Sequence, residues 1–354
     1  MLLVLLALIS VYSFTNKSKT KKVKKVIFII GDGMGLAQIS GTMSETNERN
    51  AFERFNVIGM SKTSSSDNYV TDSGAGATVF AIGKKTFNGA ISVGVDSMAY
   101  PSLFEMMKKK KMATGVVVTS SITHATPACF YAHVSSRKSE EDIASFLLQG
   151  NCDIAIGGGS KFIKSRKDNV DLTTLLQNNG FMVKTDTSNI YTPLLANKQV
   201  YTLAFDGMKR KLDGRNDFLK QASLSAVSKL NNNKNGYMLM IEGSQIDWGG
   251  HDNNYEYMKT ELLDLNETMN AVLDYAEKQG DVLVVVTADH ETGGLSLHPN
   301  KENKKLFKPN YSTGGHSGIM VPVFAFGPGA ENFGGIYENT EIHFKFKKLI
   351  GLEE

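Results

Sequence analysis

Six continuous apolar runs rich in β-branched residues recur along the chain, and each ends in a polar or glycine-rich turn. They are VKKVIFIIGDG, TGVVVTSS, CDIAIGGG, YMLMIEGS, DVLVVVTADH and VPVFAFGPG. Because neither face of such a run is polar, the pattern predicts strands that are covered on both sides, as in a parallel sheet flanked by helices. The segments between the runs include 101–111, 139–149 and 257–279, which carry apolar residues at helical spacing, the last with Gly280 as a stop signal.

Strands that alternate with helices predict an α/β fold with a doubly wound, mostly parallel central sheet and helices on both faces. In such a fold, ligands gather at the carboxyl ends of the strands. The chain has 354 residues, of which 41% are hydrophobic, and it shows neither an internal repeat nor an interdomain linker. We expect one domain over 21–354, in which the weakly periodic stretch 160–235 forms an insertion or a cap over the sheet.

The N-terminal run LLVLLALISVYSF, residues 2–14, has the length of a signal-peptide core and is short for a membrane span. We therefore expect 1–20 to be a signal peptide and the protein to be exported, either periplasmic or secreted. Lysines follow the run and none precedes it, so an uncleaved anchor, which would be the only membrane contact, stays an alternative. Cys129 and Cys152 either pair in an oxidising compartment or remain two buried thiols.

The net charge of +3 is nearly balanced. The clustered lysines are not interleaved with aromatic residues, so we expect no nucleic-acid partner.

Carboxylates and imidazoles cluster at the ends of the predicted strands. These side chains are typical ligands of zinc and magnesium. Asp247 and His251 lie four residues apart on a predicted helix and share one face. His316 lies in STGGHSG, among residues too small to hide it. The remaining strand-end candidates are Asp32 in GDGMG, Glu242 in EGSQID, and Asp289 and His290 in TADHETGG. We expect His133, His298 and His343, which have no such setting, to be structural or on the surface.

Ser73 lies among glycines, alanines and threonines in VTDSGAGAT. Small residues of this kind commonly serve close helix packing, but the serine could also be a nucleophile. A serine hydroxyl needs a base or a metal to activate it, and no GxSxG elbow is present here. Any activator must therefore come from elsewhere in the chain.

Six motifs resemble those of the alkaline phosphatase family and occur in the same order over residues 24–330. They are IIGDGMG, VTDSGAGAT, THATPACFYAHVSSRK, EGSQIDWGGHDN, TADHETGG and STGGHSG. The resemblance implies hydrolysis of small-molecule phosphate monoesters through a phosphoserine, with two zinc ions and one magnesium ion. It also implies a homodimer, although the chain is shorter than many members, so a monomer stays an alternative.

The resemblance also implies a role for each matching residue. Ser73 would be the nucleophile, Arg137 would grip the phosphate, and Asp72 would orient Arg137. One zinc would be held by Asp247, His251 and His316, the second by Asp32, Asp289 and His290 with Ser73 as a ligand during the reaction, and the magnesium by Asp32, Thr126 and Glu242.

Two positions vary within the family. His124 and Trp248 resemble some marine and cold-adapted bacterial members. The imidazole leaves less negative charge near the third site, so the identity of the third metal stays open. Trp248 would either stack on the leaving group or form an aromatic wall.

Relatives that share the same metal cage are the nearest alternatives. Sulfatases need a cysteine or serine followed by proline and arginine, which VTDSGAGAT lacks. Phosphodiesterases usually carry threonine as the nucleophile, and Arg137 favours a phosphate dianion over a diester; cofactor-independent phosphoglycerate mutases form a third group. A non-catalytic phosphate- or metal-binding protein is disfavoured because every expected ligand is present.

Overall fold

The structure is a computed structural model that describes residues 22–185 and 197–353. The predicted signal peptide or anchor at 1–20 lies outside the described residues. Within the described part, no helix is both long and apolar enough to cross a membrane.

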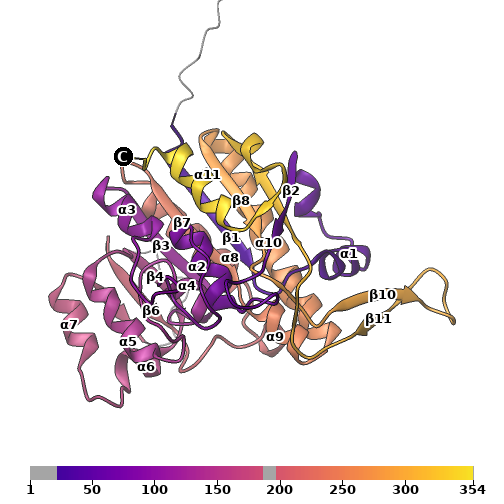
Figure 1. Ribbon diagram of the computed structural model, residues 1–354, viewed down its shortest axis with the longest axis horizontal. Helices are drawn as coiled ribbons and strands as arrows, with labels where there is room; N and C mark the ends of the chain where they lie inside the picture. The colour runs from indigo at the N-terminus through magenta and orange to yellow at the C-terminus, as the bar shows by residue number, and fades with distance from the viewer. Residues whose placement is uncertain (1–21, 186–196, 354) are drawn as a thin grey trace, which may run out of the picture.

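A sheet forms the centre of the described structure (Figure 1). It has ten strands, in the order β14-β2-β13-β8-β1-β7-β3-β4-β6-β5. All six predicted strands belong to it: β1 (Lys25–Gly31), β3 (Ala113–Ser121), β4 (Ile154–Gly158), β7 (Tyr237–Gly243), β8 (Val282–Thr287) and β13 (Val321–Phe326). Strand β1 pairs in parallel with β7 and β8, and β3 pairs in parallel with β7 and β4. The predicted fold class, a mostly parallel doubly wound α/β sheet, is confirmed.

Strand β13 departs from this pattern because it runs antiparallel to β8. No helix lies between them: the chain passes through β9 (Glu291–Thr292), the hairpin of β10 (Leu295–Pro299) and β11 (Phe307–Tyr311), and β12 (His316–Ser317). A parallel strand would need a crossover that carries the chain back to the amino ends of the strands, and this connection provides none. The chain therefore enters β13 beside the carboxyl end of β8, and β13 runs antiparallel to β8.

Helices cover both faces of the sheet, and the pattern within β1 shows why its sequence is continuously apolar. Val26, Phe28 and Ile30 pack into one core with α2 (Ser73–Ile82), α3 (Leu103–Lys109) and α11 (Thr340–Ile350). Ile27 and Ile29 pack into the other core with α8 (Phe218–Leu230) and α10 (Tyr255–Gln279). Alternate residues of one strand thus fill opposite cores.

The predicted helices are present. The segment 101–111 contains α3, and 139–149 forms α5 (Glu140–Ser145) and the 3-10 helix η2 (Phe146–Gln149). Helix α10 ends at Gly280, which adopts the left-handed conformation with φ of 71°. The other elements outside 160–235 are α1 (Leu36–Ser44), η1 (Ala51–Arg54), β2 (Val57–Lys62), α4 (Ala125–Ala128), α9 (Gln245–His251), η4 (Ala330–Phe333) and β14 (Gly335–Glu338).

The stretch 160–235 supplies both sheet strands and covering helices. Strands β6 (Gln199–Thr202) and β5 (Met182–Lys184) extend the sheet beyond β4 in parallel. Helix α8 packs on β3 and β7. The same stretch contains α6 (Ser160–Lys164), α7 (Leu172–Asn178) and η3 (Lys211–Asp213).

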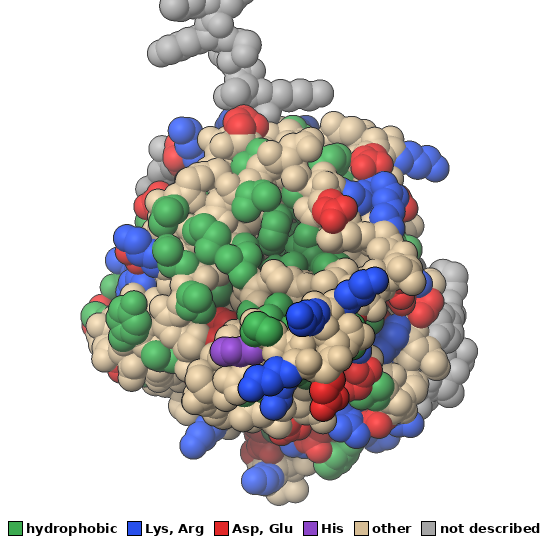
Figure 2. Space-filling model, turned by 90° about the vertical axis from the view of Figure 1, so that its right-hand side faces the viewer, with side chains coloured by type: hydrophobic (Ala, Val, Ile, Leu, Met, Phe, Trp, Pro, Cys, Tyr) green, Lys and Arg blue, Asp and Glu red, His purple; other side chains and the backbone are tan. Residues whose placement is uncertain are grey.

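The opposite edge of the sheet carries exposed apolar side chains. Strand β14 is the edge strand and pairs with β2. Ile336 in β14 is 65% exposed and Ile58 in β2 is 58% exposed. Hydrophobic side chains gather on the face of the molecule seen in Figure 2.

The two cysteines, Cys129 and Cys152, are free and buried, which confirms the alternative of two thiols.

Candidate active site

The candidate site lies where three adjacent central strands reach their carboxyl ends. Asp32 follows β1, Glu242 lies near the end of β7, and Asp289 and His290 follow β8. Strand β1 lies between β7 and β8, so these side chains converge although the chain separates them by up to 258 positions (290 minus 32). His316 lies in β12, just before the antiparallel strand β13, and comes to the same end of the strands.

Three groups of candidate ligands occur among the described residues, each with one ligand atom per residue and all such atoms within 4.8 Å of one another. They are Asp247, His251 and His316; Asp32, Asp289 and His290; and Asp32, His124 and Glu242. Asp32 belongs to two groups and so links them. Thr126, expected at the third group, has a buried hydroxyl there with no hydrogen-bond partner.

The electrostatics of the site fit bound cations. Both carboxylate oxygens of Asp32, one of Glu242 and one of Asp289 are buried without a hydrogen-bond partner. Burial, followed by repulsion from Asp289, raises the pKa of Asp32 well above its ordinary value, and burial raises the pKa of Glu242 to about 7. Unpaired buried carboxylates are strongly unfavourable unless positive charge offsets them, and oxygen and imidazole donors suit zinc and magnesium.

Two histidines of the first group are each held through Nδ1, and their Nε2 atoms lie 3.1 Å apart. His251 Nδ1 lies 2.7 Å from the carbonyl oxygen of Gly314, and His316 Nδ1 lies 2.8 Å from that of Thr71. A carbonyl can only accept, so each Nδ1 carries the proton and each Nε2 keeps its lone pair. The Nε2 atoms lie 3.4 Å and 3.5 Å from Asp247 Oδ1. The ring orientations are therefore set by the protein itself.

Ser73 is the first residue of α2 and is 2% exposed. Its Oγ lies 3.2 Å from Nε2 of His290. Burial and the charge of His316 lower the pKa of His290 well below its ordinary value. The small residues around Ser73 have a packing reason as well, because a Cβ added to Gly76 would lie only 3.1 Å from Cβ of Asp289.

Arg137 is held against the start of α2. Its Nη1 donates to Asp72 Oδ2 at 2.9 Å, while Nη2 lies 3.2 Å from His124 Nε2. Asp72 is also the N-cap of α2, and its Oδ1 accepts from the N–H groups of Ala75 and Gly89 at 2.9 Å each. Burial alone would raise the pKa of Asp72, but the Ala75 N–H and Arg137 outweigh it and lower the pKa. Burial and the charge of Arg137 lower the pKa of His124 to about 3.

Trp248 stands beside this group. It is half-buried, and its ring centroid lies 6.3 Å from that of His124. A Cβ added to Gly207 would lie 2.7 Å from Trp248 Cη2, so the loop at Gly207 packs on the indole. The indole thus forms a wall next to the candidate ligands, and stacking on a leaving group stays a prediction.

The comparisons with known proteins show the family to which the chain belongs. A model of the family described as "Alkaline phosphatase" matches residues 23–308. Alkaline phosphatase 3 of Bacillus subtilis is 33% identical over 92% of this chain and 89% of its own length. The chain belongs to the alkaline phosphatase family. The alkaline phosphatase of Escherichia coli is 28% identical over 94% of the chain and 87% of its own length. The solved structure of alkaline phosphatase from the Antarctic bacterium TAB5 is 43% identical over 95% of the chain and all of its own, with a TM-score of 0.90.

The protein is therefore an alkaline phosphatase, a metal-binding hydrolase that acts on small-molecule phosphate monoesters. The three histidines set aside from the sequence lie outside the ligand groups. His133 pairs with Glu105, His343 is buried against the carbonyl oxygen of Phe80, and His298 is exposed beside Ser296.

A set of buried polar residues that contact the candidate ligands or their neighbours was not predicted from the sequence. Glu291, next to His290, accepts hydrogen bonds from Gln38 and from the hydroxyl of Ser317, next to His316. Thr292 contacts two candidate ligands directly. Glu291 and Thr292 are visible in TADHETGG, but only their burial distinguishes them from ordinary loop residues.

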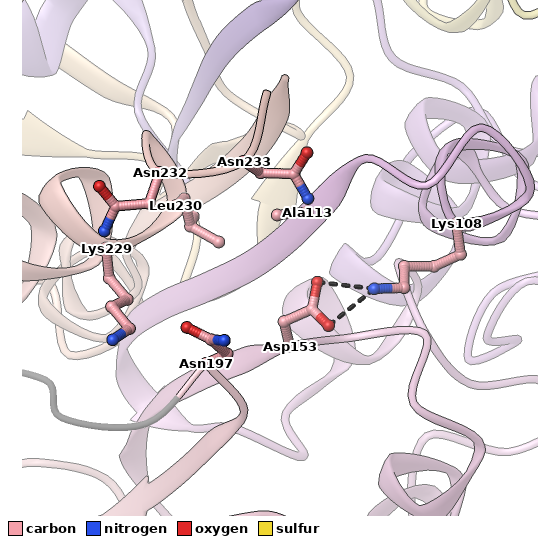
Figure 3. Close-up of a pocket in the computed structure, with 8 residues that line it drawn as sticks. All are labelled: Lys108, Ala113, Asp153, Asn197, Lys229, Leu230, Asn232 and Asn233. Atoms are coloured by element: carbon pink, nitrogen blue, oxygen red, sulfur yellow. Dashed lines mark hydrogen bonds and ion pairs between the residues drawn. The ribbon is translucent and has the colours of Figure 1, made fainter. Parts of the chain in front are cut away.

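A separate cavity of about 290 Å³ lies at the amino ends of the strands, away from the candidate ligands (Figure 3). Lys108 points across it and pairs with both oxygens of Asp153 at 2.7 and 2.8 Å. The backbone N–H of Thr114 also donates to Asp153. Because Asp153 is fully engaged by these donors, this cavity contains a structural ion pair and is no second candidate for the phosphatase chemistry.

Proposed function

We propose that this alkaline phosphatase hydrolyses phosphate monoesters through a covalent phosphoserine on Ser73. The observation that carries the proposal is the position of Ser73 Oγ, 3.2 Å from His290 Nε2 at the start of α2. The partial positive charge of a helix N-terminus favours an anion there, whether an alkoxide or a phosphate. Ser73 has no histidine near it in the sequence, and we infer that it is activated by the ligand groups that the fold brings around it.

We further propose which residues hold the ions. Asp247, His251 and His316 would hold one zinc, and Asp32, Asp289 and His290 would hold the second, with Ser73 as a ligand only during the reaction. Asp32, Thr126 and Glu242 would hold magnesium, with His124 at the edge of that group. When bound, two such ions stabilise the attacking and departing oxygens of an in-line displacement and lower the pKa of water.

The protein's own residues then account for the two displacements. Ser73 Oγ forms a bond to phosphorus as the bond from phosphorus to the alcohol oxygen breaks, and the alcohol leaves. Water then attacks the same phosphorus from the opposite side and breaks the bond to Ser73 Oγ, which releases inorganic phosphate. Arg137 offers N–H donors to the non-bridging oxygens through both steps, because its fork matches two oxygens at once.

Arg137 also supports monoesters over diesters as substrates. A monoester dianion presents three charged terminal oxygens, whereas a diester carries a single charge and a second bulky group. The guanidinium is tied on one side by Asp72, which leaves its remaining N–H groups for the substrate. No contact in the described structure favours a diester.

A Ser73→Ala variant tests the proposal, with Ser223→Ala as the matched control. Ser223 is fully buried in α8 and its hydroxyl has no hydrogen-bond partner, so the control removes a serine hydroxyl outside the site. We expect S73A to form no acid-stable phosphoenzyme from a chromogenic phosphomonoester, while its bound zinc stays at the control's level. Phosphoenzyme in S73A, or loss of zinc together with the phosphoenzyme, would contradict a nucleophilic role.

Export and a homodimer remain predictions. We infer export, to the periplasm or the medium, from the apolar run at 2–14, and the dimer from the family. Mass measurement of the mature chain from cell fractions would test the first, and light scattering of the purified protein would test the second. A full-length N-terminus in the cytoplasmic fraction would contradict export, and a monomeric mass at micromolar concentration would contradict the dimer.

A further inference from the structure

Thr292 lies at the junction of the two candidate zinc groups. Its hydroxyl donates to Asp247 Oδ1 of one group at 2.5 Å and lies 3.2 Å from His290 Nδ1 of the other. Thr292 is fully buried, and its backbone pairs with that of His316. Within the described structure, one hydroxyl therefore contacts a ligand of each zinc group.

The hydrogen bonds of Thr292 determine which ring nitrogen of His290 carries a proton. A threonine hydroxyl has one proton, and the Thr292 hydroxyl donates it to Asp247 Oδ1. The proton of Thr292 is thus committed to Asp247, which leaves the Thr292 oxygen to accept from His290 Nδ1–H. This assigns the tautomer of His290: Nδ1 carries the proton, and Nε2 keeps its lone pair toward Ser73 Oγ.

The surrounding backbone is shaped to seat this threonine. A Cβ added to Gly33 would lie 2.6 Å from Thr292 Oγ1, and one added to Gly250 would lie 2.9 Å from Thr292 Cγ2. Gly33 follows Asp32, and Gly250 lies in α9 between Asp247 and His251. The Thr292 N–H also donates to the carbonyl of Gly33 at 3.2 Å. Two glycines therefore admit both the hydroxyl and the methyl group of Thr292.

We propose that Thr292 is a positioning residue that couples the two zinc groups, because its hydroxyl orients Asp247 and fixes the metal-binding tautomer of His290. This proposal rests on the proposed function, since it assumes that both groups bind zinc. It predicts that loss of one hydroxyl, which itself binds no ion, weakens both zinc sites at once. A residue that merely packed against α9 would weaken neither site when its hydroxyl was replaced by a methyl group.

The test compares Thr292→Val, which keeps the shape, with Thr292→Ser, which keeps the hydroxyl. Thr268→Val is the matched control, because Thr268 is fully buried in α10 and its hydroxyl bonds only to the carbonyl of Asp264. Zinc affinity is measured by competition with a chromophoric chelator on the purified proteins. We expect T292V to bind both zinc ions about 10- to 100-fold more weakly, while T292S and T268V stay close to wild type.

A second measurement reports on the proton itself. In ¹⁵N spectra of the imidazole groups, wild type and T292S should show His290 protonated at Nδ1, and T292V should change that signal. Two zinc sites of wild-type affinity in T292V would overturn the proposal, as would weakening of one site alone. Failure of the wild-type protein to bind zinc would instead refute the proposed function, so the two failures are distinguishable.

Discussion

Asp72 performs two tasks with its two carboxylate oxygens, and a single substitution can separate them. Oδ1 accepts from the N–H groups of Ala75 and Gly89, which caps α2, and Oδ2 accepts from Arg137 Nη1. In Asp72→Asn, the amide oxygen can remain at the Oδ1 position and keep both backbone hydrogen bonds. The NH₂ group then replaces Oδ2 and faces the guanidinium, donor against donor. The variant therefore keeps the cap and releases Arg137.

The magnitudes follow from what each variant loses. Freeing the arginine side chain restores rotamer entropy that phosphate binding must then remove, about 1–2 kcal/mol, which corresponds to about 5- to 30-fold weaker phosphate binding. Asp72→Asn should unfold with a free energy within about 1 kcal/mol of wild type, because the helix stays capped. Asp72→Ala also loses the cap and should be destabilised by about 1–2 kcal/mol.

Inhibition of chromogenic phosphomonoester hydrolysis by inorganic phosphate measures the first effect, and urea unfolding measures the second. We expect both variants to share the weaker phosphate inhibition and only Asp72→Ala to lose stability. An unchanged phosphate inhibition constant in Asp72→Asn would refute the role of Asp72 in holding Arg137. Equal destabilisation of the two variants would refute the assignment of the cap to Oδ1.

Three further predictions concern stability. Arg215→Met should lower the free energy of unfolding in urea by about 3–5 kcal/mol, because it removes the buried guanidinium that pairs with both Glu261 and Asp264 and leaves only the contacts of Lys211 to them; an unchanged midpoint would contradict this. Burial lowers the pKa of His133, but its bond to Glu105 outweighs burial and raises it. The contribution of protonated His133 to the free energy of unfolding is therefore complete below about pH 6.5 and is lost as pH rises through the raised pKa. His133→Gln should therefore lower the free energy of unfolding more at about pH 6 than at about pH 9, and the reverse order would refute the pairing with Glu105. Removal of divalent ions by a chelator should lower the melting temperature, and added zinc should restore it; a melting temperature that ignores both would count against bound ions.

The sequence alone was sufficient for the strands that carry the site. A strand buried on both faces must be apolar at every position, so its ends are marked by the first polar residue. In this chain those polar residues are the candidate ligands themselves, as Asp32 after β1 and Asp289 after β8 show. Strands β5, β6 and β14 were not predicted, because strands of three or four residues leave little periodic signal, and β2 was not predicted either.

The direction of β13 also lay beyond local pattern, since an apolar run reads the same in a parallel or an antiparallel strand. The direction of β13 decides the position of His316, because His316 precedes β13, whereas Asp32 follows β1 and Asp289 follows β8. Since β13 runs antiparallel to β8, the start of β13 lies beside the carboxyl end of β8, and His316 comes to the same end of the strands as Asp289.

The sequence by itself determined the α/β class, the central strands and the types of side chain at their ends, because the apolar runs of buried strands and the periodicity of helices are patterns within single segments of the chain. The tertiary structure alone decided which of those side chains meet and how each is oriented. Asp72 holds Arg137 across 65 positions, and Thr292 joins Asp247 to His290 across 45. Hydrogen bonds of this kind depend on distances and directions between distant segments, which no local pattern contains.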